Sequence, residues 1–598
     1  MRRTGFLILW VWVAVATAAA APPVDYTISL ANARQHLLKV RLHVAGTSAE
    51  RDVQLPVWNA LYQVRDFAQY VRRVTAKNAA GQSLPVRKLD KTTWRVSRAE
   101  SGADLEYEIL AELPGPFGFH ANGTHVFLNL AMVLMYPLDS RDAPMTVTFT
   151  DVPAGWRIAT ALPVLRSGVY TARNYDRLVD GPVEIGNFRE VSFEEGGATY
   201  RIVVDANPAD YDLDQIKGWV RQIVTAGVWW MDDRPFTSYL FLYHFPRGHG
   251  GGGMEHAYST AIDVSADYLR ENPLEFTAAT AHEFFHLWNV KRLRPQSLEP
   301  IDYTRENFTV SLWFAEGVTS TVADLLLLHA GLMSERQYLD ELTKEIRTLE
   351  LRPAHRVQPV EEASLDTWFD KYPQYRTPER SVNYYNKGRI LGVLLDLAVR
   401  ERSGGRKSLR DVLQWMNRNY ANEARYYPDS AGVQRAAEAV TGSDFSQFFR
   451  DYVAAAEELP YNELLGTVGL KLERSKTTVV NPGFLTVRNF DQPSVVVSVD
   501  PGSEAERAGL TPGDTILTVN GKPLSNDFEN QLAGMKIGET LRLRVTGRKG
   551  SREVKIKLGG REQESFAIID LPSATPQQRA RRAAWLASQP EEAVASTP

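Results

Sequence analysis

Short runs of alternating apolar and polar residues fill the first third of the chain. Examples are residues 37–44, 145–150 and 199–204, and Gly and Pro residues separate such runs, as in residues 114–118. Alternation predicts half-buried strands, and the turn residues predict the reversals between them. We therefore predict an antiparallel β domain of sandwich type over residues 21–207.

After residue 208 the spacing of the apolar positions changes. Residues 212–229 have a helical pattern and residues 237–243 a strand pattern. From residue 272 onward helical patterns dominate, at residues 273–288, 310–329, 334–349, 384–401, 409–420 and 444–457. This change predicts a second, mainly α-helical domain over residues 208–464.

Valine-rich strand patterns return near residue 470, with Pro-Gly and Asn-Gly turn signals between them. They predict a third domain over residues 465–560. The remaining residues, 561–598, are expected to form a carboxyl-terminal tail with one basic helix, which Thr575 caps and Pro576 begins, and with a disordered end. The predicted fold class is multidomain α+β.

The first residues predict an export signal. Arg2 and Arg3 precede an apolar run at residues 6–15, and small residues follow at 18–20. This order is typical of a secretory signal peptide, here residues 1–20. The alternative is a membrane anchor, but the run is short for a span of about 20 residues. We expect an exported protein, periplasmic or secreted, with no stable membrane insertion after signal removal.

The amino-acid composition excludes several classes of function and of catalytic site. The 598 residues include 68 basic and 72 acidic side chains, a balance that argues against a nucleic-acid-binding protein. The chain contains no Cys, which excludes thiol nucleophiles, iron–sulfur clusters, Cys-ligated zinc, disulfides and a lipid-modified amino-terminal Cys. Any catalytic metal must therefore be held by carboxylates and by some of the 11 His.

The segment Ala281-His-Glu-Phe-Phe-His-Leu-Trp288 contains a candidate metal site. On a helix, His282 and His286 project from one face, one turn apart. Asn272 and Pro273 mark the start of that helix. Both imidazoles can then bind one Zn²⁺ ion, while Glu283 faces the water that the zinc activates.

A catalytic zinc site needs a third protein ligand, and here it should be a carboxylate. The downstream candidates are Glu299, Asp302, Glu306 and Glu316. Glu316 is the only one that stands within an apolar helical run, where a buried carboxylate needs a cation. We therefore predict one zinc ion per chain, with Glu316 as its third ligand.

Four motifs, HEFFHLWNVKRLRP, LWFAEGVTS, GGGGMEH and YYNKG, occur in this chain. Together they closely resemble the glycyl aminopeptidase family of zinc peptidases, which are gluzincins with a thermolysin-like catalytic domain and a PDZ domain near the carboxyl end. The resemblance implies that His282, His286 and Glu316 bind zinc. It also implies that Glu283 is the general base and acid.

The same resemblance implies two further groups of site residues. Gly253, Met254 and Glu255 match the substrate-binding edge of related aminopeptidases, where the Glu holds the free α-amine. Tyr385 matches the tyrosine that stabilises the oxyanion. From the residues alone, the glycines equally suit a flexible turn, and Tyr384 and Tyr385 equally suit core aromatics that open a helix.

The third domain resembles a PDZ domain. Residues 481–485 are similar to a carboxylate-binding loop, and residues 503–520 to a PDZ core. The resemblance implies a peptide groove at Gly483, Phe484 and Leu485 that takes a carboxyl-terminal peptide as an added strand. The alternative is a structural appendage with an occluded groove.

These features favour a zinc aminopeptidase that acts on peptides with a free amino terminus. The family resemblance suggests small amino-terminal residues such as Gly or Ala. One alternative is a zinc endopeptidase whose PDZ domain presents substrate tails. Another, from a different class, is a non-catalytic PDZ scaffold.

Overall fold

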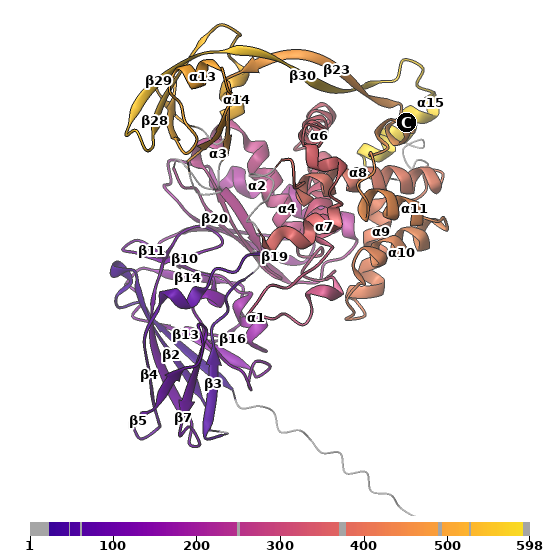
Figure 1. Cartoon of the computed structure of the whole chain (residues 1–598). Coiled ribbons are helices and arrows are strands. Elements are labelled where there is room, and N and C mark those ends of the chain that lie inside the picture. Colours follow the sequence, from indigo (N-terminus) through magenta and orange to yellow (C-terminus); the bar gives the residue numbers. More distant parts are fainter. Residues whose placement is uncertain are drawn as a thin grey trace, which may run out of the picture.

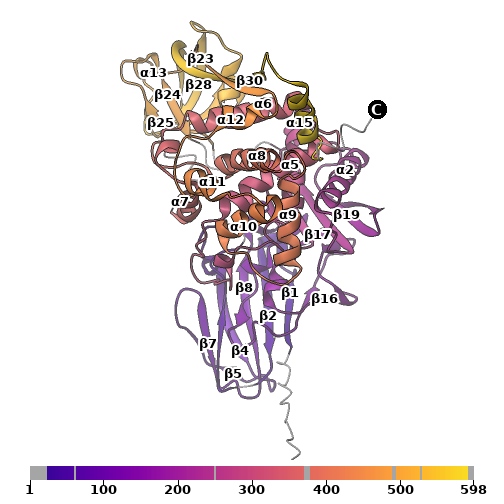
Figure 2. The ribbon, with the colours of Figure 1, turned by 90° about the vertical axis from the view of Figure 1, so that its right-hand side faces the viewer.

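The structure, a computed structural model, describes residues 23–589 except residues 47, 60–61, 248–250, 370–377, 488–492 and 525–527. The predicted signal peptide and the end of the predicted tail, residues 590–598, lie outside the described residues. Three regions follow one another along the molecule, a β domain, a helical region and a small β-rich domain (Figures 1 and 2). This order confirms the predicted multidomain α+β fold class.

The amino-terminal domain is built from strands whose side chains alternate between core and surface. Its largest sheet has eight strands, and strand β8 (Ala103–Leu110) alternates buried and half-buried residues along its whole length. The predicted antiparallel pairing is wrong at one place, because β1 (Val24–Ser29) pairs in parallel with β13 (Met145–Thr150). These strands are far apart in sequence, and alternation alone does not encode the direction of a long-range pairing.

Two strands that we assigned to the amino-terminal domain belong to the next one. Strands β18 (Arg189–Glu195) and β19 (Ala198–Asp205) join a five-stranded sheet with β20 (Ser238–His244), β22 (Ser259–Val264) and β21 (Gly251–Glu255). Strand β19 pairs in parallel with β20. The change of sheet therefore occurs before the predicted boundary at residue 207, because an alternating pattern does not specify the sheet that a strand joins.

The predicted helices of the middle region are present. They are α2 (Leu213–Met231), α4 (Pro273–Phe285), α5 (Thr319–His329), α6 (Glu335–Glu350), α8 (Tyr384–Arg402) and α9 (Leu409–Met416). The predicted helix over residues 310–329 begins with a π-helical turn, η5 (Trp313–Val318), before α5. The predicted helix over residues 444–457 is a short α-helix and a π-helical turn, at Ser446–Phe448 and Phe449–Val453.

One large core joins the five-stranded sheet to these helices. Phe241 of β20, Phe284 of α4 and Trp313 of η5 are fully buried in it. Because α4 and η5 are packed on the same core, the side chains of the candidate metal site are held on rigid elements. No helix among the described residues is long and apolar enough to cross a membrane.

The third domain has its own core and is joined to the helices by a long two-stranded ladder. Strands β23 (Leu470–Asn481) and β30 (Gly559–Asp570) form this ladder, which Figure 1 shows passing over the helical region. The stretch expected as a tail therefore includes most of β30. It also contains the predicted helix, α15 (Pro576–Leu586), which Thr575 caps and whose Trp585 is fully buried.

Candidate functional site

Helix α4 carries the HExxH segment and begins as predicted. Asn272 is the cap residue and Pro273 the first helical residue, although the Asn272 side chain makes no capping hydrogen bond. His286 directly follows the last helical residue and keeps an α-helical conformation, and its N–H donates to the carbonyl of His282 at 3.2 Å. The two imidazoles therefore remain on one face, as the four-residue spacing predicts.

The structure brings the three predicted metal ligands together. The Nε2 atoms of His282 and His286 lie 2.9 Å apart. Glu316 Oε2 lies 3.4 Å from Nε2 of His282 and 3.2 Å from Nε2 of His286. One ligand atom from each of the three residues lies within 4.8 Å of the ligand atoms of the other two, a spacing that suits a bound metal ion.

Neighbouring groups fix the orientation of both imidazoles. Nδ1 of His286 donates to the carbonyl oxygen of Asn289 at 2.7 Å, because a carbonyl only accepts. Ser320 Oγ donates to the Glu316 carbonyl and so accepts from Nδ1 of His282, at 3.2 Å. Both Nε2 atoms therefore point at the metal position, the arrangement in which outer hydrogen bonds orient metal ligands. Sequence reasoning gave no role to Ser320 or Asn289.

Glu316 enters the site from the π-helical turn η5 and is only 4% exposed. Burial alone raises the pKa of this carboxyl, but the charge of His286 and the hydrogen bonds from both imidazoles lower it well below its usual value. Burial likewise lowers the pKa of His286, but the charge of Glu316 outweighs it and raises that pKa to about 10. The site therefore favours a positive charge, and two imidazoles with one carboxylate are a donor set that suits catalytic zinc.

Glu283 lies beside this group without belonging to it. Burial, the largest effect, raises the pKa of its carboxyl to about 8, and the charges of Glu255 and Glu316 act in the same direction. Among the described residues, no hydrogen-bond partner contacts its buried Oε2. A carboxylate held this way has a free oxygen and an increased affinity for a proton, which are the properties of a general base.

Strand β21 forms the wall opposite α4 and is the edge strand of its sheet. Gly253 pairs with Ile262 of β22, and a Cβ atom at Gly253 would lie only 2.3 Å from the Glu283 carboxyl group. The glycine therefore makes room for Glu283, a role that we did not predict. Glu255 follows two residues later on the same strand.

All predicted residues of the peptidase site line one cavity. This cavity is bounded by the three metal ligands, Glu283, Gly253, Met254, Glu255, Tyr384 and Tyr385. Sequence reasoning missed four further lining residues, Tyr62, Gln63, Phe117 and Thr367. Three of these come from the amino-terminal domain, and no motif near them indicates that their loops reach a site on another domain.

The two adjacent tyrosines at the start of α8 differ in their surroundings. Tyr384 is 2% exposed, and its hydroxyl is 3.1 Å from the hydroxyl of Thr367. The Tyr385 ring is only partly buried, with its centroid 6.2 Å from that of the His282 ring. Tyr384 thus has the position of a core aromatic, whereas Tyr385 lies beside the metal ligands.

The three residues predicted to form the peptide groove of the third domain differ in conformation and in exposure. Gly483 has a φ of 78°, a conformation that favours glycine, and it directly precedes β24 (Phe484–Val487). Phe484 is 3% exposed and packs on Phe528, whereas Leu485 is 50% exposed. Of these side chains, Leu485 is therefore the one that a peptide on this strand can contact.

Comparison with known proteins adds family and structural relatives. Residues 25–187 match the Peptidase M61 N-terminal domain family, residues 275–391 the M61 glycyl aminopeptidase family and residues 495–544 a PDZ domain family. Comparison with curated protein sequences gives no match.

Solved structures also resemble this chain. A crystal structure of an aminopeptidase N family protein from Idiomarina loihiensis has 25% sequence identity and a TM-score of 0.80, over 94% of this chain and 100% of that one. An M1 zinc metallopeptidase from Deinococcus radiodurans has 14% identity over 74% of this chain and 95% of that one, but its TM-score of 0.47 is too low to support a conclusion. The two M61 family models and the PDZ model thus match this chain in the order that the sequence predicts, and together with the site geometry they indicate a zinc metallopeptidase.

Proposed function

We propose that this chain is a zinc-dependent aminopeptidase that releases amino-terminal residues from peptides. The observation that carries this proposal is the position of Glu255, whose carboxylate lines the same cavity as the metal ligands and Glu283. A carboxylate in this cavity can pair with the α-ammonium group of a peptide, which would place the first peptide bond near the metal ligands.

In the proposed reaction, the residues that line the cavity have different roles. His282, His286 and Glu316 would hold a zinc ion, which would supply Lewis-acid activation of water and of the substrate carbonyl. Glu283 takes the proton of the attacking water and gives it to the departing amine, a transfer that its raised pKa favours. Tyr385 donates a hydrogen bond to the oxyanion that develops on the substrate carbonyl.

Strand β21 supports an extended substrate in this proposal. It is an edge strand, so a peptide can lie beside it. The absence of a side chain at Gly253 leaves space for Glu283 between the strand and the metal ligands. A preference for small amino-terminal residues, such as Gly or Ala, is proposed from the family alone.

Peptides with free and acetylated amino termini provide the test. We expect the wild-type chain to cleave only the free peptide, and Glu255→Gln to raise KM for it. The matched control is Glu271→Gln, which changes an exposed carboxylate and should have no effect. Efficient cleavage of the acetylated peptide would favour the endopeptidase alternative and refute a strict aminopeptidase.

The catalytic role is tested at Glu283, and a wild-type chain that hydrolyses no peptide would favour the scaffold alternative. Loss of a general base lowers kcat by about 10²–10⁴-fold. We expect this loss in Glu283→Gln with the zinc content unchanged. Equal hydrolysis by the variant and the wild type would show that Glu283 has no catalytic role.

We also propose that the PDZ domain binds the carboxyl-terminal tail of a peptide. Strand β24 is the edge strand of its sheet, and the half-exposed Leu485 lies on it. Fluorescent peptides with free or amidated carboxyl termini would test this by anisotropy. We expect binding only of the free form, weakened by Leu485→Glu, and binding of neither form would support the appendage alternative.

Export remains a proposal, supported by the pattern of residues 1–20. Expression of the full chain in a Gram-negative host, followed by fractionation and mass measurement, tests it. We expect a shortened protein in the periplasm, and an uncleaved cytoplasmic protein would contradict this.

A further inference from the structure

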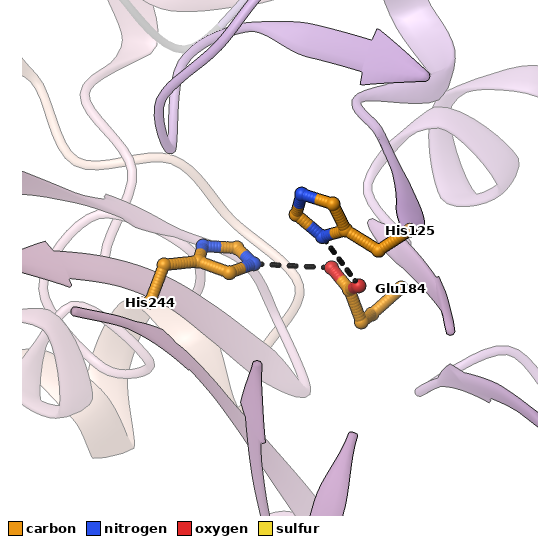
Figure 3. Close-up of side chains that lie close together, drawn as sticks. All are labelled: His125, Glu184 and His244. Atoms are coloured by element: carbon orange, nitrogen blue, oxygen red, sulfur yellow. Dashed lines mark hydrogen bonds and ion pairs between the residues drawn. The ribbon is translucent and has the colours of Figure 1, made fainter. Parts of the chain in front are cut away.

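A second group of His and carboxylate side chains lies away from the peptidase cavity. Among the described residues, His125, Glu184 and His244 have ligand atoms within 4.8 Å of one another, the same criterion that the peptidase site meets. Figure 3 shows both imidazoles directed at the Glu184 carboxylate, His244 from the left and His125 from above. None of these residues belongs to a motif noted in the sequence.

This cluster lies where the amino-terminal domain meets the sheet of the peptidase domain. His125 begins β11 (His125–Leu128) and Glu184 lies on the adjacent β17 (Val183–Gly186), in a sheet of the amino-terminal domain. His244 ends β20 of the peptidase sheet. A ligand shared by the three side chains would therefore link the two domains.

The distances within the cluster leave no room for water between its members. Oε1 of Glu184 lies 3.1 Å from Nδ1 of His125, and Oε2 lies 3.0 Å from Nε2 of His244. Glu184 is fully buried, and the side chain of His244 is 10% exposed. At these distances, either each imidazole donates an N–H to the carboxylate or a metal ion is bound between the nitrogens and the oxygens.

An outer layer of polar groups holds the imidazoles in place. Nδ1 of His244 donates to Oδ1 of Asp263 at 2.9 Å, which leaves Nε2 directed at Glu184. Nε2 of His125 lies 2.7 Å from Nε2 of His120, which can accept its proton and so leaves Nδ1 of His125 directed inward. A carboxylate behind a histidine in this way is the usual outer support of a metal ligand.

A second carboxylate lies beside the cluster. Asp205, at the end of β19, forms an ion pair with Nδ1 of His125. The cluster itself has three potential ligands, His125, Glu184 and His244, which are the same donor types as in the peptidase site. Two imidazoles and one carboxylate suit zinc among the divalent metals.

We propose that His125, Glu184 and His244 bind a second zinc ion, which joins the amino-terminal domain to the peptidase domain. The ion replaces the two protons that the imidazoles otherwise need in order to face Glu184. It takes no part in hydrolysis, because none of its ligands lines the peptidase cavity.

Zinc counting on the full-length chain tests the proposal. After zinc loading and removal of loosely bound metal, mass spectrometry should find about two ions per wild-type chain. The variant His282→Gln/His286→Gln should keep about one, and adding Glu184→Gln should remove it. The matched control Glu194→Gln, at an exposed carboxylate of the peptidase sheet, should keep the wild-type count.

A second measurement uses a variant in which His125, Glu184 and His244 are unchanged. Zinc should raise the thermal unfolding midpoint of His282→Gln/His286→Gln, and Co²⁺ should give this variant the visible absorption bands of a bound ion. One ion in the wild type and none in this variant would overturn the proposal and identify the cluster as a network of protonated histidines. Two ions in the wild type and in Glu184→Gln would also overturn it, because the second ion would then lie elsewhere.

Discussion

Substitution of Gly253 tests how the carboxyl group of Glu283 is positioned. In Gly253→Ala the new Cβ atom would lie 2.3 Å from Cγ, Cδ and Oε1 of Glu283, whereas ordinary contacts begin at 3.4 Å. The carboxyl group must therefore move by about 1 Å, because the clash involves the whole group and not one flexible atom. The three atoms nearest to the new Cβ all belong to Glu283.

The size of the effect follows from this displacement. A misplacement of about 1 Å in a reacting group costs about 10²-fold in rate. We therefore expect Gly253→Ala to lower kcat by about 10²-fold, which corresponds to about 2.7 kcal/mol in the activation free energy. The zinc content and the thermal unfolding midpoint should change little.

The assay is hydrolysis of a chromogenic glycyl or alanyl amide, with zinc counted in the same samples. The matched control is Gly251→Ala, on the same strand, where a Cβ atom would meet nothing within 4 Å. Its kcat should be that of the wild type. Equal activities of the two variants would refute the conclusion that Gly253 gives Glu283 its position, and a loss of zinc in Gly253→Ala would show that the strand acts on the metal ligands instead.

Three further predictions concern helix α8. Tyr385→Phe should lower kcat by about 10²–10³-fold with KM and zinc content nearly unchanged, since the variant lacks only the oxyanion donor; a changed KM alone would contradict this role. Gly388→Ala would put a Cβ atom 2.3 Å from the Trp313 carbonyl oxygen, so calorimetry should show a loss of about 1–3 kcal/mol in the free energy of unfolding. Gly218→Ala, where the space is open, is its control and should not destabilise the chain. Burial lowers the pKa of Lys387 from 10.5 to about 8, so between these values the unfolded chain binds a proton that the folded chain does not. Stability should therefore rise with pH from about 8 to 10.5, and Lys387→Met should remove this rise in thermal unfolding curves; an unchanged slope would contradict the shift.

The sequence alone predicted most elements of the fold, because each has a local period. The helical patterns at residues 212–229 and 384–401 correspond to α2 and α8 within a few residues. The pattern could not show that residues 198–205 join the peptidase sheet, since a strand has the same alternation in either sheet. Nor could it show that the helix at residues 310–329 begins with a π-helical turn.

The residues of the candidate metal site could also be predicted from the sequence. His282, Glu283 and His286 lie within one helical turn of each other, and Glu316 was identified as the carboxylate within an apolar run. Their roles stay predictions until they are tested. The hydrogen bonds that Ser320 and Asn289 accept from the two imidazoles were not predictable, because such residues are common and neither lies at a diagnostic spacing.

The sequence by itself determined the local elements, the order of the domains and the residue types that any metal must use. Only the tertiary structure decided which distant residues meet. It places Gly253 against Glu283, brings Tyr62 and Phe117 to the peptidase cavity, and gathers His125, Glu184 and His244 from two domains. The physical reason is that periodicity records which face of an element is buried, whereas the partner on that face depends on packing between segments far apart in the chain.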